Sequence, residues 1–377
     1  MTQTPAYLPP KPHYQILDGL RGVASLYVVT FHIFETFAND NRFTQLLNHG
    51  YLAVDFFFLL SGFVVAYAYD DRWVKMKQWD FYKRRLIRLQ PMVIMGSLVG
   101  AALFYFQSCN IFPLIPQTPI WQMLLVMFVG FTLIPLPPSM DIRGWQEMHP
   151  LNGPAWSLFF EYIANILYAV VVRKFSKKLL ATFVFFCACL LIYYTVFGDQ
   201  GDVIGGWTLD KTNLNIGFTR LLYPFFAGVL LCRAGKLIRI KNAFWICSIL
   251  IIIILSMPRI GGPEHLWMNG LYESFAIIII FPLIVSVGAG GDIKNKYSIK
   301  ICKFLGDISY PLYITHYPIM YVYMAWVINN NIQMEKGLWA GTLVLVASIA
   351  LAYACLKLYD EPVRNWLKKR FLMKPVQ

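Results

Sequence analysis

Residues 51–69 read YLAVDFFFLLSGFVVAYAY, an apolar run in which Asp55 is the single charged side chain. A run of this length can cross the hydrocarbon core of a bilayer as a helix, which needs about 17–25 residues. The rest of the chain has the same character, since 58% of all residues are hydrophobic and 14% are charged. A soluble domain carries roughly 25% charged residues. Much of the surface must therefore face lipid, and we predict an all-α, polytopic transmembrane helical bundle.

Further apolar runs of similar length recur along the sequence and predict about ten spans in all. The predicted spans lie at 18–37, 51–69, 89–107, 155–172, 179–197, 215–232, 242–258, 269–288, 304–328 and 338–356. A shorter apolar piece, 120–136, ends at two prolines, Pro137 and Pro138, which oppose helix continuation. We expect this piece to be a re-entrant or short segment, with a full eleventh span as the alternative.

Basic side chains gather in every second loop and so indicate the orientation of the chain. The basic segments are 70–88, 173–178, 233–241, 294–303 and the tail after 357. By the positive-inside rule these segments and both termini are cytosolic, and the chain is a multi-pass membrane protein. This accounts for the formal charge of +13, so we expect membrane lipids and no nucleic acid as partners. The predicted spans 89–107 and 155–172 then both meet segment 108–154 on the outer side of the membrane, so this segment must begin and end on that side.

The domain organisation predicted from this pattern is one transmembrane domain over 1–377. Residues 1–14 are expected to form a cytosolic N-terminal tail and residues 360–377 a cytosolic C-terminal tail, with no appended soluble domain. The N-terminal residues lack the apolar core and cleavage site of a signal peptide. The seven cysteines have no metal-ligand spacing, so no metal is expected.

The first span holds the densest set of polar residues, Asp18, Arg21, His32 and Glu35. A charged group inside a bilayer costs roughly 2.5–3.5 kcal/mol on insertion scales, so each is a functional candidate. Arg21 and His32 lie eleven residues apart, which places them on one helical face at a separation of about 16 Å. Imidazole is the usual proton carrier at neutral pH, so we predict that His32 is catalytic. Asp18 and Arg21 also have the spacing of a helix-start ion pair.

Polar residues at the ends of other spans join this set. Asp55 stands at the outer end of the second span, and Glu161 lies near the outer entrance of the span that begins at 155. Arg85 and Arg88 share one helical face at the cytosolic surface. That face suits phosphate, although a cluster of charges that only sets topology has the same pattern. Segment 306–316 brings together a serine, two tyrosines and His316, for which packing is the favoured role.

At these residues the chain resembles the membrane-bound acyltransferase-3 family of bacteria. The matches run in order along the whole length and coincide with the predicted spans. The matching motifs are Leu17–Gly22 leading to His32 as an Arg-x10-His signature, Asp55–Phe63, Arg85-x-x-Arg88, Trp156–Leu158 with Glu161, Ile308–His316, and Glu361-Pro362.

The resemblance implies a role for each matching residue. His32 would be catalytic, and Arg21 would hold the donor or the active geometry. Arg85 and Arg88 would bind the donor, acetyl-CoA, on the cytosolic side, and Ser309 and Tyr310 are assigned to the same site. The acceptor would be a hydroxyl on a surface or secreted glycan, with envelope-polysaccharide biosynthesis proteins as further partners. Asp55 or Glu161 would orient the imidazole or pair with Arg21, and the sequence does not choose between them.

Two alternatives remain open from the sequence. His32 either deprotonates the acceptor hydroxyl or is itself acetylated before passing the group on. A transporter or flippase of a lipid-linked sugar is the rival function, although the sequence contains no internal repeat of the kind such proteins use. The tryptophans of the outer segments would stack on sugar rings in an enzyme, but Trp is also common at membrane interfaces.

Overall fold

The structure, a computed structural model, describes residue 11, residues 13–38 and residues 41–372. Over these residues it confirms the predicted all-α bundle, with no β-strand in the described ranges and an isolated bridge between Glu147 and Thr208. The principal helices are α1 (Gln15–Glu35), α2 (Ala53–Tyr69), α3 (Gln78–Leu103), α4 (Ile120–Gly130), α5 (Ala155–Val170), α6 (Lys177–Phe197), α7 (Lys211–Ala234), α8 (Ala243–Ser256), α9 (Leu266–Phe275), α10 (Phe281–Gly290), α11 (Lys296–Asn329), α12 (Met334–Cys355) and α13 (Glu361–Phe371).

Polar caps and a glycine fix several of these helix ends. Ser176 accepts a hydrogen bond from the backbone N–H of Leu179 and so starts α6, and Asp210 starts α7 in the same way. Helix α7 ends at Gly235, whose φ of 66° lies in the left-handed region that glycine adopts without strain. These local signals place the loops between the predicted spans.

The core of the bundle is built on two long helix pairs, α1 against α11 and α2 against α7. Close approach of α2 and α7 depends on glycine, because a Cβ on Gly62 would lie 1.8 Å from the carbonyl oxygen of Phe225. A Cβ on Gly228 would likewise lie 2.1 Å from the carbonyl oxygen of Leu59. Small residues let membrane helices approach until their backbones touch. This packing brings α1, α2, α7 and α11 together around the polar residues.

Eight helices in the described ranges are long and apolar enough to cross a membrane, α9 and α10 counting as one helix with the π-turn between them. Two predicted spans fall outside this set. Segment 242–258 contains α8, which has 14 residues, and segment 304–328 lies within the 34-residue α11. Helix α4 has 11 residues and is only about 16 Å long, too short to cross a core of about 30 Å. It therefore fits the short segment rather than an eleventh span.

The segment predicted as the C-terminal tail is helical over most of its described length. Residues 361–371 form α13, which continues α12 through the π-turn Leu356–Asp360. The sequence has no helix breaker at this junction beyond Pro362, which lies in the first turn of α13 and is tolerated there. The predicted N-terminal tail lies mostly outside the described residues, as do residues 373–377.

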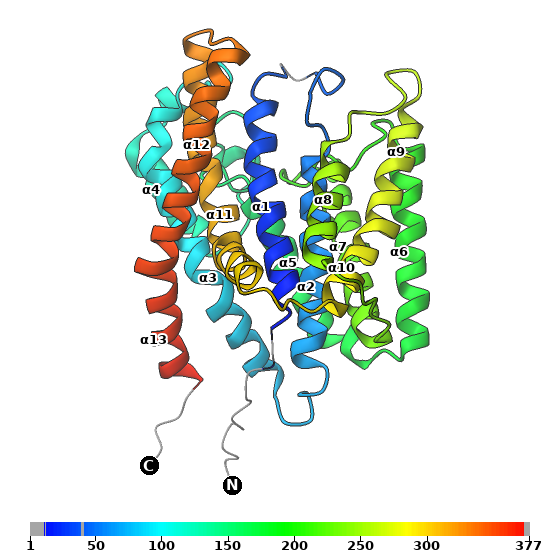
Figure 1. Cartoon of the computed structure of the whole chain (residues 1–377). Helices are drawn as coiled ribbons and strands as arrows, with labels where there is room; N and C mark the ends of the chain where they lie inside the picture. The colour runs from blue at the N-terminus through cyan, green and yellow to red at the C-terminus, as the bar shows by residue number, and fades with distance from the viewer. Residues whose placement is uncertain (1–10, 12, 39–40, 373–377) are drawn as a thin grey trace.

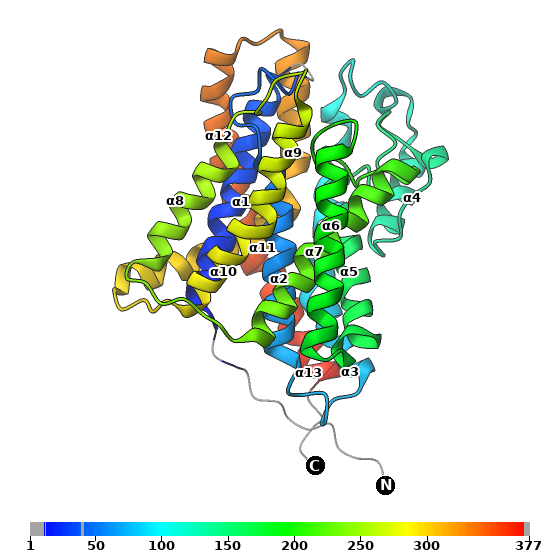
Figure 2. The same ribbon diagram turned by 90° about the vertical axis from the view of Figure 1, so that its right-hand side faces the viewer.

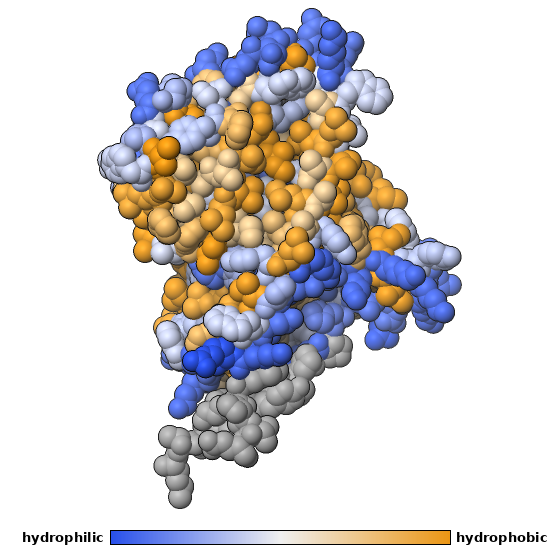
Figure 3. All heavy atoms as spheres, turned by 90° about the vertical axis from the view of Figure 1, so that its left-hand side faces the viewer, coloured by the Kyte–Doolittle hydropathy of each residue, from blue (hydrophilic) through white to orange (hydrophobic). Residues whose placement is uncertain are grey.

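The two ends of the bundle differ in charge. Helix α1 begins and α13 ends at the same end (Figure 1), and the loops α2–α3, α5–α6, α7–α8 and α10–α11 turn there. We call this the basic end, because these loops carry the basic segments of the sequence. Figure 2 shows the long helices running between it and the opposite end, with α4 and the chain after it packed to one side. Figure 3 shows a broad apolar band between hydrophilic ends on the face that carries α12.

Candidate active site

Two cavities contain the residues predicted for the site. The larger cavity, of about 1010 Å³, opens between the loops at the end opposite the basic end. Its wall includes His32 and Glu35 from α1 and Arg220 from α7. Other polar and aromatic side chains of the wall come from the segments between helices, and Trp156 and Tyr317 come from α5 and α11: Arg42, Gln45, Asn48, Tyr51, Asn110, Trp145, Glu147, Trp156, Trp207 and Tyr317. The first predicted catalytic residue therefore faces a space large enough for a substrate.

Glu35 holds His32 in a defined orientation. The Nδ1 atom of His32 lies 2.6 Å from the Oε2 atom of Glu35, one turn further along α1. A carboxylate can only accept, so Nδ1 carries a proton, and in the neutral imidazole Nε2 then presents its lone pair. Among the described residues no group bonds Nε2, and the His32 ring packs against the edge of Tyr317 and stacks on His316 at 5.7 Å. The geometry leaves Nε2 available to accept a proton or an acyl group.

Asp55 pairs with Arg220, and no contact between Asp55 and His32 or Arg21 is found among the described residues. Its Oδ2 atom lies 2.7 Å from Nη2 of Arg220, and both side chains are almost completely buried. Arg220 also donates to the backbone oxygens of Tyr51 and Gly205. Buried charges persist only when they are paired and hydrogen-bonded in this way. Asp55 and Arg220 therefore tie α2 to α7 beneath the larger cavity.

A smaller pocket of about 140 Å³ lies toward the basic end. It brings together the five residues assigned to the donor from the sequence, Arg21, Arg85, Arg88, Ser309 and Tyr310, and it also contains Glu161, for which a catalytic role was predicted. Asp18 also lines it and pairs with Arg21 at 3.3 Å, as the helix-start spacing predicted. The set is assembled from α1, α3, α5 and α11, so only the folded bundle brings it together.

Most charged groups in the smaller pocket are paired. Arg21 donates from Nε to Oγ of Ser309 at 2.7 Å, and Arg85 donates from Nη2 to Glu161 at 2.6 Å. Glu161 thus belongs to this pocket, where its partners are Arg85 and Ser61 and not His32. Tyr310 donates to the backbone oxygen of Leu89 at 2.7 Å. Arg88 is exposed and has no partner among the described residues, so it is free to bind an anion.

A buried polar group near the larger cavity went unrecognised in the sequence. Tyr321 donates to both carboxylate oxygens of Glu147 at 2.8 Å, and the Arg143 guanidinium lies 3.6 Å from the centre of the Tyr321 ring. Burial raises the pKa of Glu147 to about 7, against the opposing effects of Arg143 and Tyr321. Burial also lowers the pKa of the neighbouring His149 to about 3, which keeps that imidazole neutral. Nothing in the sequence pattern of 131–154 marks these residues.

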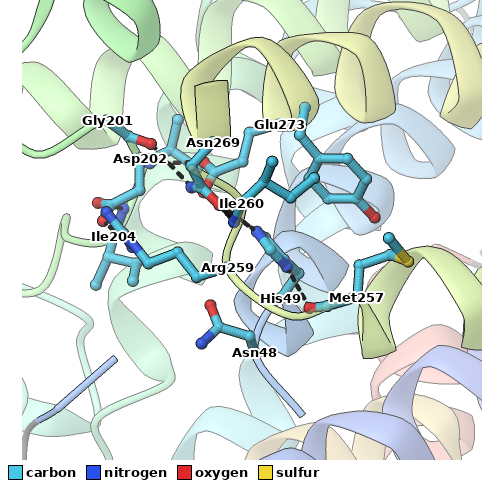
Figure 4. A network of polar contacts seen from close by, with 12 residues as sticks. Asn48, His49, Gly201, Asp202, Ile204, Met257, Arg259, Ile260, Asn269 and Glu273 are labelled. Carbon is cyan, nitrogen blue, oxygen red and sulfur yellow. Dashed lines mark hydrogen bonds and ion pairs between the residues drawn. The ribbon is translucent and has the colours of Figure 1, made fainter. Parts of the chain in front are cut away.

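A polar network joins loops at the end of the bundle opposite the basic end, near the larger cavity (Figure 4). Oδ2 of Asp202 accepts from Arg42 at 2.9 Å and from Arg259 at 2.8 Å. His49 lies between the backbone oxygen of Met257 at 2.7 Å and the side chain of Asn269 at 3.0 Å. The network joins the loops before α2, before α7 and before α9. It keeps Arg42, which lines the cavity, in a fixed position.

Comparison with known proteins places this geometry in a chemical class. A family model described as "Acyltransferase domain" matches residues 14–357. The O-acetyltransferase OatA of Staphylococcus aureus (strain NCTC 8325 / PS 47) is 22% identical, with 99% of this chain and 60% of OatA aligned. Protein 2 in the picA locus of Rhizobium radiobacter is 33% identical over 42% of this chain and 83% of its own length. The chain thus spans 60% of the length of OatA. No solved structure matched the chain.

Proposed function

Since the chain belongs to the acyltransferase-domain family and is a multi-pass membrane protein, we propose that it moves an acetyl group from cytosolic acetyl-CoA to a hydroxyl of an extracytoplasmic glycan. The observation that carries the proposal is the position of His32. His32 lines the larger cavity and its Nε2 atom has no partner among the described residues, while Arg21, eleven residues earlier on α1, lines the smaller pocket. One helix therefore joins a basic pocket to a substrate-sized cavity.

The smaller pocket supports a CoA thioester as the donor. The positive-inside rule assigns the basic end to the cytosol, which is where acetyl-CoA is made. Arg88 is exposed and unpaired beside Arg85, and guanidinium groups are the preferred partners of phosphate. A volume of about 140 Å³ suits an extended arm rather than a nucleotide. We place the phosphates at the mouth of the pocket and the pantetheine arm inside it.

The larger cavity supports a glycan as the acceptor. Three tryptophans, Trp145, Trp156 and Trp207, line it together with the side-chain amides of Gln45 and Asn48. Aromatic faces stack on sugar rings, and amides bond their hydroxyls. The names of relatives such as OatA, which describe O-acetyltransferases, agree with a hydroxyl acceptor.

The chemistry follows from the free Nε2 atom of His32. In the direct route, Nε2 takes the proton of the acceptor hydroxyl as its oxygen attacks the thioester carbonyl. The C–S bond breaks, an ester C–O bond forms, and the proton passes to the CoA thiolate, so the products are the acetyl ester and CoA thiol. In the two-step route, Nε2 attacks the thioester carbonyl, the C–S bond breaks and CoA leaves as the thiolate. The acceptor oxygen then attacks the acetyl group on the imidazole, the N–C bond breaks, and the hydroxyl proton passes to the thiolate. Glu35 stabilises the imidazolium in either route.

The test is acetyl-CoA-dependent labelling by the purified full chain. Radiolabel from acetyl-CoA that appears on a glycan, with one CoA thiol released per label, supports the proposal. Movement of a lipid-linked sugar across proteoliposomes without CoA release supports the flippase instead and contradicts it.

Replacing Arg88 with alanine is expected to weaken donor use. Loss of one hydrogen bond between charged partners costs about 1.5–3 kcal/mol, so the KM for acetyl-CoA should rise roughly 10- to 150-fold while kcat changes little. Arg88→Lys should recover part of the loss, because it keeps the charge without the planar fork. Lys83→Ala, one and a half turns earlier on α3 and outside the pocket, is the matched control. An unchanged KM in Arg88→Ala would exclude Arg88 from the donor site.

A further inference from the structure

Val54 on α2 and Tyr313 on α11 are, among the described residues, the two that line both the smaller pocket and the larger cavity. We infer that the acyl group crosses from the donor pocket to His32 at this boundary, and that the side chain of Val54 sets the largest acyl group that can cross. The inference rests on the proposed function and deepens it, because it names the residue that selects among acyl donors.

The residues of α1 also divide between the smaller pocket and the larger cavity. Arg21, Ser25, Val28 and His32 follow one another at intervals of four, three and four residues, so they share one face of the helix. Arg21 and Ser25 line the smaller pocket, whereas Val28 and His32 line the larger cavity. The change therefore occurs between Ser25 and Val28, within one helical turn. His32 itself does not reach the smaller pocket, so a donor held there must pass its acyl group through the boundary.

The two boundary side chains are held firmly. The hydroxyl groups of Tyr313 and Ser157 lie 2.8 Å apart, and Ser157 also donates to the backbone oxygen of Pro154. Phe57 packs edge-on against the Tyr313 ring at a centroid distance of 5.3 Å. Val54 precedes Asp55, which is fixed by its ion pair with Arg220. A fixed opening discriminates by size, because its walls cannot move aside for a longer chain.

The boundary is also apolar, which suits the group that has to pass. The Val54 side chain, the Phe57 ring and the Tyr313 ring present no charge toward it, while the charged groups of the pocket lie on the side of Arg21 and Arg85. An acyl tail can therefore enter while the CoA phosphates remain outside. In such an opening each methylene that does not fit changes the relative rate roughly 10- to 200-fold.

The experiment compares two donors in one protein. CoA release by the purified full chain is measured with acetyl-CoA and with butanoyl-CoA, using a glycan extract of the source cell envelope as the acceptor. Val54→Ala should raise the butanoyl-to-acetyl ratio of kcat/KM roughly tenfold, since two methyl groups leave the opening. Val28→Ala removes the same two methyl groups from the wall of the larger cavity alone and should leave the ratio unchanged. A ratio is independent of the amount of folded protein.

A second variant narrows the opening. Val54→Phe should lower acetyl transfer at least tenfold while the affinity for CoA, measured by calorimetry, stays within twofold of the wild type. If the ratio in Val54→Ala matches that of the wild type and Val54→Phe transfers normally, the inference is overturned. If the wild-type protein releases no CoA from either donor, the proposed function itself fails. The two failures are therefore distinguishable.

Discussion

His32→Ala is expected to lower acetyl transfer by roughly 10²- to 10⁴-fold, the range that a positioned general base supplies. The same loss follows if Nε2 carries the acetyl group, because alanine removes the nucleophile in both routes. Transfer is measured as CoA release and label on the acceptor, with equal amounts of protein that elute as one peak in size-exclusion chromatography. Transfer at the wild-type rate by this variant would remove His32 from the mechanism.

Glu35→Gln serves as the companion variant. Glutamine can still bond Nδ1 but no longer stabilises a positive imidazolium, so we expect a smaller loss than in His32→Ala. Thr36→Ala, at the next residue and also on the cavity wall, is the matched control. An equal rate in Glu35→Gln and the wild type would mean that the 2.6 Å contact has no catalytic part.

Asp55→Ala is expected to destabilise the folded protein by about 3–5 kcal/mol, because it leaves the Arg220 guanidinium buried without its counter-ion. The measurement is unfolding in detergent, followed by tryptophan fluorescence. Replacing both residues with leucine should recover most of the loss, since it removes the uncompensated charge.

Asp70→Ala is the matched control for this prediction. Asp70 pairs with Arg233 at the same 2.7 Å, but 27% of its side chain is exposed, against 0% for Asp55. Water can replace part of a partly exposed ion pair, so the loss of folding stability in Asp70→Ala should be clearly smaller. Equal stability of Asp55→Ala and the wild type would refute the account of this pair.

The sequence predicted the fold well because apolar length is a local property. Each predicted span is helical, and the loops with basic residues turn at one end of the bundle. The departures from the predicted spans also have physical causes. Helix α8 is shorter than a span because Asn242 and Met257 leave helical geometry at its two ends. The continuation from α12 into α13 was missed because charged residues after 357 resemble a tail, although they also suit an exposed helix.

The candidate site could be predicted only as a set of residues. Their grouping depends on which helices meet, and that is decided by non-local packing such as the approach of α2 to α7. The sequence therefore left open whether Asp55 or Glu161 orients His32 or pairs with Arg21, whereas in the structure Asp55 pairs with Arg220, a charged residue inside a predicted span. The contact between Glu35 and His32 could have been predicted, because residues three positions apart lie on the same face of a helix. Glu147 and Tyr321 had none, because they are far apart in sequence.

The central claim is that the chain moves an acetyl group from a donor on the basic side to an acceptor on the other side, in a transfer that depends on His32. The most direct measurement seals radiolabelled acetyl-CoA inside proteoliposomes that contain the full chain and adds envelope glycan outside. We predict label on the external glycan with the wild-type protein and none with His32→Ala. Label transferred equally by His32→Ala, or no label on the glycan with the wild-type protein, would contradict the account.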